Sequence, residues 1–172
     1  MESILQTKKL IITLVLILST IRLFSYDYVL LNKKQFPLPA KYRGYKSSEQ
    51  GLRDSIPGTA TYHYAIDYAC PDKTEVYACD DGYVINAYPS YYNGEKWKGD
   101  KSLGGLLEIR HSDGSTSLYG HLSMTLVTEG TFVRRGQLIG WSGGVKGRRG
   151  SGITTGPHLH FAIYVDIESL LE

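Results

Sequence analysis

Short β-type segments follow one another from residue 62 to residue 165, and they limit the fold more than any other feature. They are rich in Val, Ile, Tyr and Phe and are separated by residues that favour turns. After residue 25 no stretch shows a sustained helical period, except for a short one over residues 167–171. We therefore predict a β-rich sheet, sandwich or barrel, with strands at residues 62–69, 75–78, 83–87, 106–110, 115–119, 131–133, 137–141 and 158–165.

The N-terminal segment resembles an export signal. The chain has 172 residues, which suits one compact domain once this segment is set aside. Lys8 and Lys9 precede an apolar run over residues 10–18, and Ser25 is a small residue suited to a cleavage position. The run is shorter than the ~20 residues of a spanning helix, which favours a cleaved signal. However, Arg22 lies late in this segment, which argues against cleavage, so an uncleaved anchor through residues 8–25 is the alternative. Both predict export to the periplasm or cell envelope.

Composition argues against one class of partner. The net charge is only +2, and no basic run with interleaved aromatic residues occurs. Nucleic-acid-binding domains usually carry such a basic surface. We therefore expect no nucleic-acid partner.

The two cysteines allow two interpretations. Cys70 and Cys79 flank a predicted turn at residues 71–74. An oxidising compartment permits a disulfide between them. However, direct pairing of strands around this turn would not place them opposite each other, and two small buried thiols are the alternative. The sequence supports both interpretations equally.

A pair of histidines near the C-terminus is the first sign of chemistry. His158 and His160 lie two positions apart in a predicted strand, so both side chains point to the same face. Leu159, Phe161 and Ile163 then point to the opposite face, into a core. Imidazole is the commonest metal ligand and a frequent acid or base. Because two surface histidines would give the same pattern, the pair needs partners elsewhere.

A second segment supplies those partners. His63, Ala65 and Asp67 share one face of a predicted strand, with Tyr64 and Ile66 behind. Together with His160, one histidine and one aspartate from this segment suit a tetrahedral zinc ion whose fourth position is open to water. This ligand set leaves net positive charge on the metal, which lowers the pKa of bound water toward ~7.

Two further histidines differ in their setting. His121 ends a predicted strand, where its side chain can reach over a groove. With His158, it is a candidate for moving protons and stabilising an oxyanion. His111 stands beside a Ser-Asp-Gly turn, and we predict that it is an exposed turn histidine.

These segments together resemble the lysostaphin/LytM-type zinc endopeptidases of bacterial cell walls. The family's H-x-x-x-D, Y-x-H-L and G-P-H-x-H-F segments occur in that order at residues 63–67, 119–122 and 156–161. The resemblance covers roughly residues 47–165. It implies a peptidase domain over residues 47–172, after an irregular lead-in over residues 26–46. It also implies a largely antiparallel β-sheet with an open groove between loops.

The resemblance assigns roles to five side chains. It implies that His63, Asp67 and His160 bind one Zn²⁺ and that His121 and His158 are the catalytic histidines. The substrate would be peptide bonds in the stems or cross-bridges of peptidoglycan.

The chain departs from the family pattern in three places. After the last motif, residues 166–172 stand in place of the family's usual closing segment. Ala65 stands where the family commonly has glycine. The loop over residues 89–105 is long for the family and would narrow the groove. The aromatic and basic residues of this loop and of the loop over residues 143–156 suggest groove walls, although solvated loops are the alternative.

Two other functions compete with the endopeptidase. One is a non-catalytic LytM-like wall-binding protein that activates another cell-wall hydrolase. Such relatives usually lack some metal ligands, whereas none is missing here. The other is a lipoyl-like or carbohydrate-binding β module, which residues 129–140 resemble. That interpretation explains this segment but not the four ordered histidines.

Overall fold

A computed structural model describes residues 33–52, 62–88, 102–148 and 151–165. The chain divides into two units, Met1–Lys34 and Gln35–Glu172. Only residues 33 and 34 of the first unit are described, so the fold below is that of the second. The predicted export segment, most of the loop over residues 89–105 and the helical stretch over residues 167–171 lie outside the described residues. No helix in the described ranges is long and apolar enough to cross a membrane.

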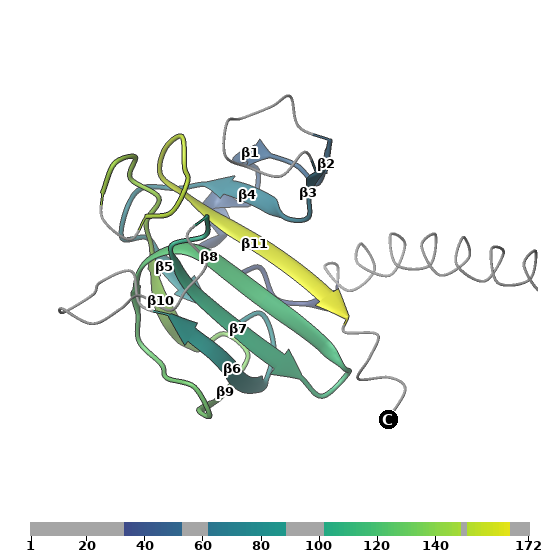
Figure 1. Cartoon of the computed structure of the whole chain (residues 1–172). Helices are drawn as coiled ribbons and strands as arrows, with labels where there is room; N and C mark the ends of the chain where they lie inside the picture. Colours follow the sequence, from purple (N-terminus) through teal and green to yellow (C-terminus); the bar gives the residue numbers. More distant parts are fainter. Residues whose placement is uncertain (1–32, 53–61, 89–101, 149–150, 166–172) are drawn as a thin grey trace, which may run out of the picture. The chain divides into compact units, whose positions relative to one another are not determined.

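An open antiparallel sheet forms the second unit, as Figure 1 shows. Its strands are ordered β1 (Lys46–Ser48), β4 (Ile66–Ala69), β11 (His158–Val165), β8 (Ser115–Thr125), β7 (Gly105–His111), β6 (Gly82–Tyr88) and β9 (Phe132–Val133). Strand β10 (Leu138–Ser142) pairs with both β8 and β5 (Glu75–Tyr77). A separate pair joins β2 (Gly51–Leu52) to β3 (Tyr62–His63). The predicted all-β, antiparallel architecture is confirmed.

Most predicted strands are present within one or two residues at their starts, and β8 extends well beyond its predicted end. The stretch over residues 62–69 is different, because it is two strands instead of one. Residues 62–63 pair with β2, whereas residues 66–69 pair with β1 and β11, so the chain changes sheets between them. Tyr64 lies at this break and is 72% exposed, so the prediction that it packs behind the strand was wrong.

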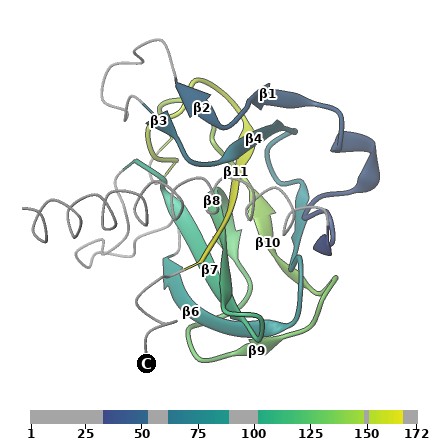
Figure 2. The ribbon, with the colours of Figure 1, turned by 90° about the vertical axis from the view of Figure 1, so that its right-hand side faces the viewer.

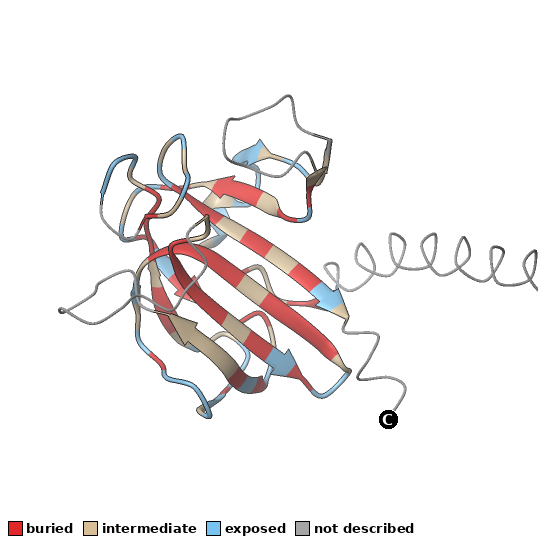
Figure 3. Ribbon diagram, in the orientation of Figure 1, coloured by how far each residue is buried: buried red, intermediate tan, exposed pale blue. Residues whose placement is uncertain are grey.

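Burial alternates along β11, whose apolar side chains point into the core, whereas most of β8 is buried at successive positions (Figure 3). Leu159, Phe161 and Ile163 are buried as predicted. The Phe161 ring lies 5.2 Å from the ring of Tyr119 on the neighbouring strand β8. An insertion also bends the sheet: Val84 and Asn86 of β6 face consecutive residues of β7, so one residue bulges out where β6 curves (Figure 2).

His111 is buried, so the prediction of an exposed turn histidine was wrong. It is the last residue of β7, and the turn begins after it. Its Nδ1 lies 2.8 Å from the Asp81 carbonyl oxygen and its Nε2 lies 2.8 Å from Ser117 Oγ. The sequence placed His111 beside a turn correctly but did not reveal these two partners, which satisfy a buried imidazole.

Cys70 and Cys79 are both buried thiols in this structure. Cys79 Sγ lies 3.7 Å from His111 Nε2, and the Cys79 backbone N–H donates to the Tyr119 hydroxyl at 2.9 Å. Burial raises the pKa of the Cys70 thiol. Of the two interpretations that the sequence allowed, the structure therefore has the buried thiols.

Candidate metal centre

Three side chains that are distant in sequence converge at one end of β11. His63 comes from β3, Asp67 from β4 and His160 from β11. Their potential ligand atoms all lie within 4.8 Å of one another. Strands β4 and β11 pair so that His160 stands directly opposite Asp67. The register of this strand pair thus brings together two of the three predicted metal ligands.

The spacing of the three atoms fits a tetrahedral metal ion. Asp67 Oδ1 lies 2.9 Å from His160 Nδ1 and 3.2 Å from His63 Nε2. The two nitrogens are 3.2 Å apart. Around a zinc ion with bonds of about 2.0–2.1 Å, two tetrahedral ligands would be about 3.3 Å apart. The three residues therefore fit the metal without rearrangement of the backbone.

Backbone carbonyls fix the orientation of three of the four histidines in this site. A carbonyl oxygen can only accept a hydrogen bond, so the ring nitrogen facing it must carry the proton. His63 Nδ1 donates to the Glu49 carbonyl at 3.0 Å. His121 Nδ1 donates to the Ser151 carbonyl at 2.8 Å, and His158 Nδ1 donates to the Gly156 carbonyl at 2.8 Å. In each neutral ring, Nε2 is left with the lone pair.

His121 lies inside β8 at an irregular point, so the prediction that it ends a strand was wrong. Residues 115–120 pair with β11, whereas residues 122–125 pair with β10, so β8 changes partner at His121. Opposite β7, the two residues Gly120 and His121 face the single residue Leu106, which makes a β-bulge. The backbone of His121 is left-handed, with φ of 57°. This conformation costs a non-glycine residue about 1–2 kcal/mol and turns the side chain toward the other histidines.

The rings of His121 and His158 lie beside the three ligand residues. Their centres are 4.5 Å apart, and the His121 ring lies 5.7 Å from the His160 ring. His158 Nε2 is 3.6 Å from Asp67 Oδ1. The structure therefore brings all five predicted site residues together, and four of them are buried, with His160 partly exposed.

Burial and hydrogen bonding set the charges of the site. Burial opposes ionisation of Asp67, but the hydrogen bond from His160 and the interaction with His63 outweigh it and hold the Asp67 pKa well below its usual range. Burial lowers the pKa of His121 to about 4, and repulsion from His158 adds to the effect. Burial also lowers the pKa of His160. At neutral pH the site thus presents a carboxylate with neutral His121 and His160 rings, which is the state that binds a metal cation.

The groups that orient the histidines were not predicted from the sequence. Three of them are backbone carbonyls, which any residue type supplies. Thr154 is different: its hydroxyl donates to the Gly144 or Gly156 carbonyl, at 3.0 and 2.8 Å, and accepts from the Gly156 N–H at 3.2 Å. It thereby fixes the carbonyl that holds His158. The loop over residues 143–156, read as groove wall or solvated loop, instead supplies two of the three orienting carbonyls.

The low pKa of His121 predicts acid sensitivity of the metal-free protein. Between about pH 6.5 and pH 4, His121 binds a proton in the unfolded chain but not in the folded one, so folding stability falls as the pH falls. We expect His121 to contribute a loss of about 2–3 kcal/mol over this range. The measurement is urea denaturation at several pH values, with His121→Asn as the control because asparagine tolerates the left-handed backbone. Parallel stability curves for the two proteins would contradict the low pKa.

Comparison with known proteins agrees with this geometry. Residues 61–170 match peptidase family M23. The chain is 39% identical over 117 residues to the DD-carboxypeptidase/endopeptidase Mpg of Neisseria meningitidis, covering 67% of this chain and 23% of that protein. It is 30% identical over 132 residues to the peptidoglycan DD-endopeptidase ShyA of Vibrio cholerae, covering 77% of this chain and 27% of that protein. The chain thus spans about a quarter of the length of these relatives.

Solved structures show the same fold. A zinc-containing peptidase from Vibrio cholerae superposes with a TM-score of 0.60 at 31% identity, over 76% of this chain and 36% of that one. The catalytic domain of lysostaphin from Staphylococcus simulans superposes with a TM-score of 0.58 at 30% identity, over 74% of this chain and 86% of that one. The resemblance predicted from three short motifs is confirmed, and the chain belongs to peptidase family M23.

Proposed function

We propose that this protein is a zinc-dependent endopeptidase that hydrolyses peptide bonds in the stems or cross-bridges of peptidoglycan. The observation that carries the proposal is the convergence of His63, Asp67 and His160 beside the rings of His121 and His158. The name of the relative ShyA, a peptidoglycan DD-endopeptidase, supports the substrate class. Export, as predicted from residues 1–25, would bring the domain to this substrate.

The donor set suits zinc better than a hard cation. Two imidazole nitrogens and one carboxylate oxygen are typical of catalytic zinc sites, whereas Mg²⁺ and Ca²⁺ prefer oxygen ligands alone. His63 would bind through Nε2, His160 through Nδ1 and Asp67 through Oδ1, because these are the atoms that face one another. A bound zinc ion supplies Lewis-acid activation of water and polarises a substrate carbonyl.

His121 and His158 would supply the proton transfers. Each ring donates Nδ1–H to a fixed carbonyl, so its Nε2 is the nitrogen available to take or give a proton. In the protonated state, the same Nε2–H would donate to the oxyanion that develops as the peptide carbonyl becomes tetrahedral. The carbonyls of Ser151 and Gly156 would keep both rings oriented through the cycle without taking the proton themselves.

Metal analysis combined with digestion of cell-wall sacculi tests the proposal. We expect about one zinc ion per chain and the release of muropeptides with newly formed peptide termini, lost with a chelator and restored by zinc. A protein that holds no zinc and releases nothing would contradict the proposal. Release only when an amidase is also present would instead support the non-catalytic activator.

A further inference from the structure

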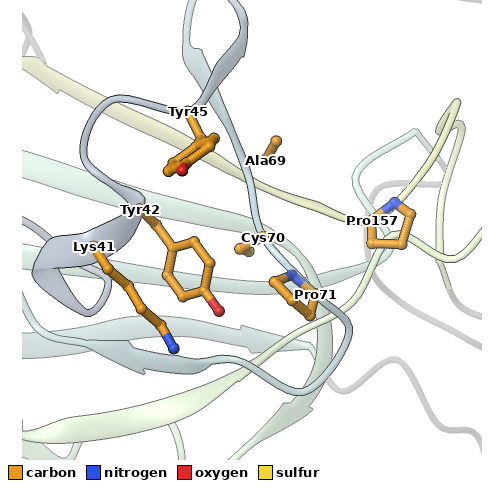
Figure 4. Close-up of a pocket in the computed structure, with 7 residues that line it drawn as sticks. All are labelled: Lys41, Tyr42, Tyr45, Ala69, Cys70, Pro71 and Pro157. Carbon is orange, nitrogen blue, oxygen red and sulfur yellow. The ribbon is translucent and has the colours of Figure 1, made fainter.

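A cavity of about 510 Å³ lies beside the metal centre, and none of the five site residues lines it. It opens between the segment over residues 41–45, the end of β4 and the residue before His158, as Figure 4 shows. Its size falls within the range of ~300–1,000 Å³ that is usual for ligand pockets. Its walls are formed mainly by Lys41, Tyr42, Tyr45, Ala69, Pro71 and Pro157.

The cavity is adjacent to the site along two strands. Ala69 lies two residues after Asp67 in β4, so both side chains point to the same face, about 7 Å apart. Ala69 also stands opposite His158 in β11, and Pro157 is the residue before His158. The span from Asp67 to the cavity wall therefore equals about two residues of extended peptide.

The side chains that line the cavity are mainly apolar, and one of them, Lys41, carries a positive charge. Tyr42 turns its ring hydroxyl toward Pro71 (Figure 4), and Tyr45 is 64% exposed. Lys41 Nζ lies 5.0 Å from the centre of the Tyr42 ring. Arg43, in the same segment, places its guanidinium over the Phe36 ring and does not line the cavity. None of the described residues that line the cavity is acidic.

The acidic residue next to the lining is already paired. Asp72 follows Pro71 in the chain, and its Oδ2 accepts a hydrogen bond from Arg148 Nη1 at 2.6 Å. Its charge is thus balanced by a residue of the loop over residues 143–156. The charge that this edge of the cavity offers to a ligand comes from Lys41, and it complements an anion.

We propose that this cavity is a substrate subsite that binds a carboxylate-bearing residue of the peptide, about two positions from the cleaved bond. The inference rests on the proposed function, because it takes the substrate to be a peptidoglycan peptide. The tyrosine and proline side chains would contact the small apolar groups of the peptide, and the Lys41 ammonium would pair with its carboxylate. Residues 41–45 precede the segment that matches the family, so this subsite is built partly by a chain segment outside the family match.

The experiment compares Lys41→Gln with Arg134→Gln in the zinc-loaded full chain. Both variants lose one positive charge. Lys41 lies shortly before β1 in the chain, whereas Arg134 follows β9, which lies at the opposite end of the sheet order from β1. The probes are two peptidoglycan-stem peptides that differ only in whether their carboxylates are free or amidated. For Lys41→Gln we expect KM to rise about tenfold on the free peptide, with kcat within about twofold and no change on the amidated one. For Arg134→Gln we expect no change on either peptide.

Equal effects of Lys41→Gln on both peptides, or no effect on either, would overturn the subsite. Dissociation constants for the same two peptides repeat the comparison without turnover. If the unsubstituted chain hydrolyses neither peptide, the proposed function fails, and the binding data still decide the subsite. A tenfold loss of binding confined to the free peptide and to Lys41→Gln supports it, and any other pattern contradicts it.

Discussion

Substitution of His160 by alanine is expected to weaken zinc binding by more than about 100-fold and to abolish hydrolysis. His160 Nδ1 is one of three converging donor atoms and lies 2.9 Å from Asp67 Oδ1. Its loss leaves two ligands, and loss of even an outer partner of a metal ligand typically costs 10–100-fold in affinity. Competition with a chromogenic chelator measures the affinity, and digestion of sacculi measures the activity.

His160→Ala also changes the protein without metal, and this effect needs its own control. Asp67 is buried and loses a hydrogen bond, which costs about 1–3 kcal/mol of stability. Circular dichroism of the metal-free variant shows whether it is folded when zinc is added. His160→Gln, which keeps a polar side chain of similar reach, serves as a second variant. Retention of one tightly bound zinc ion by both folded variants would exclude His160 as a ligand.

Strand alternation is the part of the fold that the sequence predicts well. The pattern over residues 158–165 depends only on two-residue periodicity, and the structure has Leu159 and Phe161 buried with His158 and His160 on the other face. The five site residues could be chosen because each belongs to a short motif. That His160 stands opposite Asp67, however, depends on the pairing of β4 with β11, which are about 90 residues apart in the chain. Register between such distant strands is not visible in local periodicity.

The errors have a common physical origin in long-range contacts. The break between β3 and β4 arises because the two halves of one apolar stretch pair with different strands. His111 is buried because Asp81 and Ser117 satisfy both of its nitrogens. His121 lies inside β8 and does not end it, because β8 exchanges β11 for β10 at this point and continues. In each case, a partner distant in sequence or a change of strand pairing overrides the local pattern.

Substitution of either His121 or His158 by asparagine is expected to leave zinc bound and to lower kcat by about 10²–10⁴-fold. Both rings lie beside the ligand residues, but neither belongs to the group of three whose ligand atoms converge. Asparagine cannot exchange a proton near neutral pH, although it keeps a polar group and tolerates the left-handed backbone at position 121. Zinc analysis and single-turnover hydrolysis of a stem peptide measure the two effects separately.

The double variant distinguishes a shared role from two independent ones. If both histidines act on the same proton transfer, the double variant will be little slower than the slower single variant, because residues that act as a unit are non-additive. Multiplied losses would instead indicate that each ring stabilises a different group.

Thr154→Val offers a related test. With the hydroxyl removed, the Gly156 carbonyl that holds His158 is less fixed, so kcat should fall while zinc stays bound. Loss of zinc from His121→Asn or His158→Asn would overturn the division between metal ligands and proton-transfer residues.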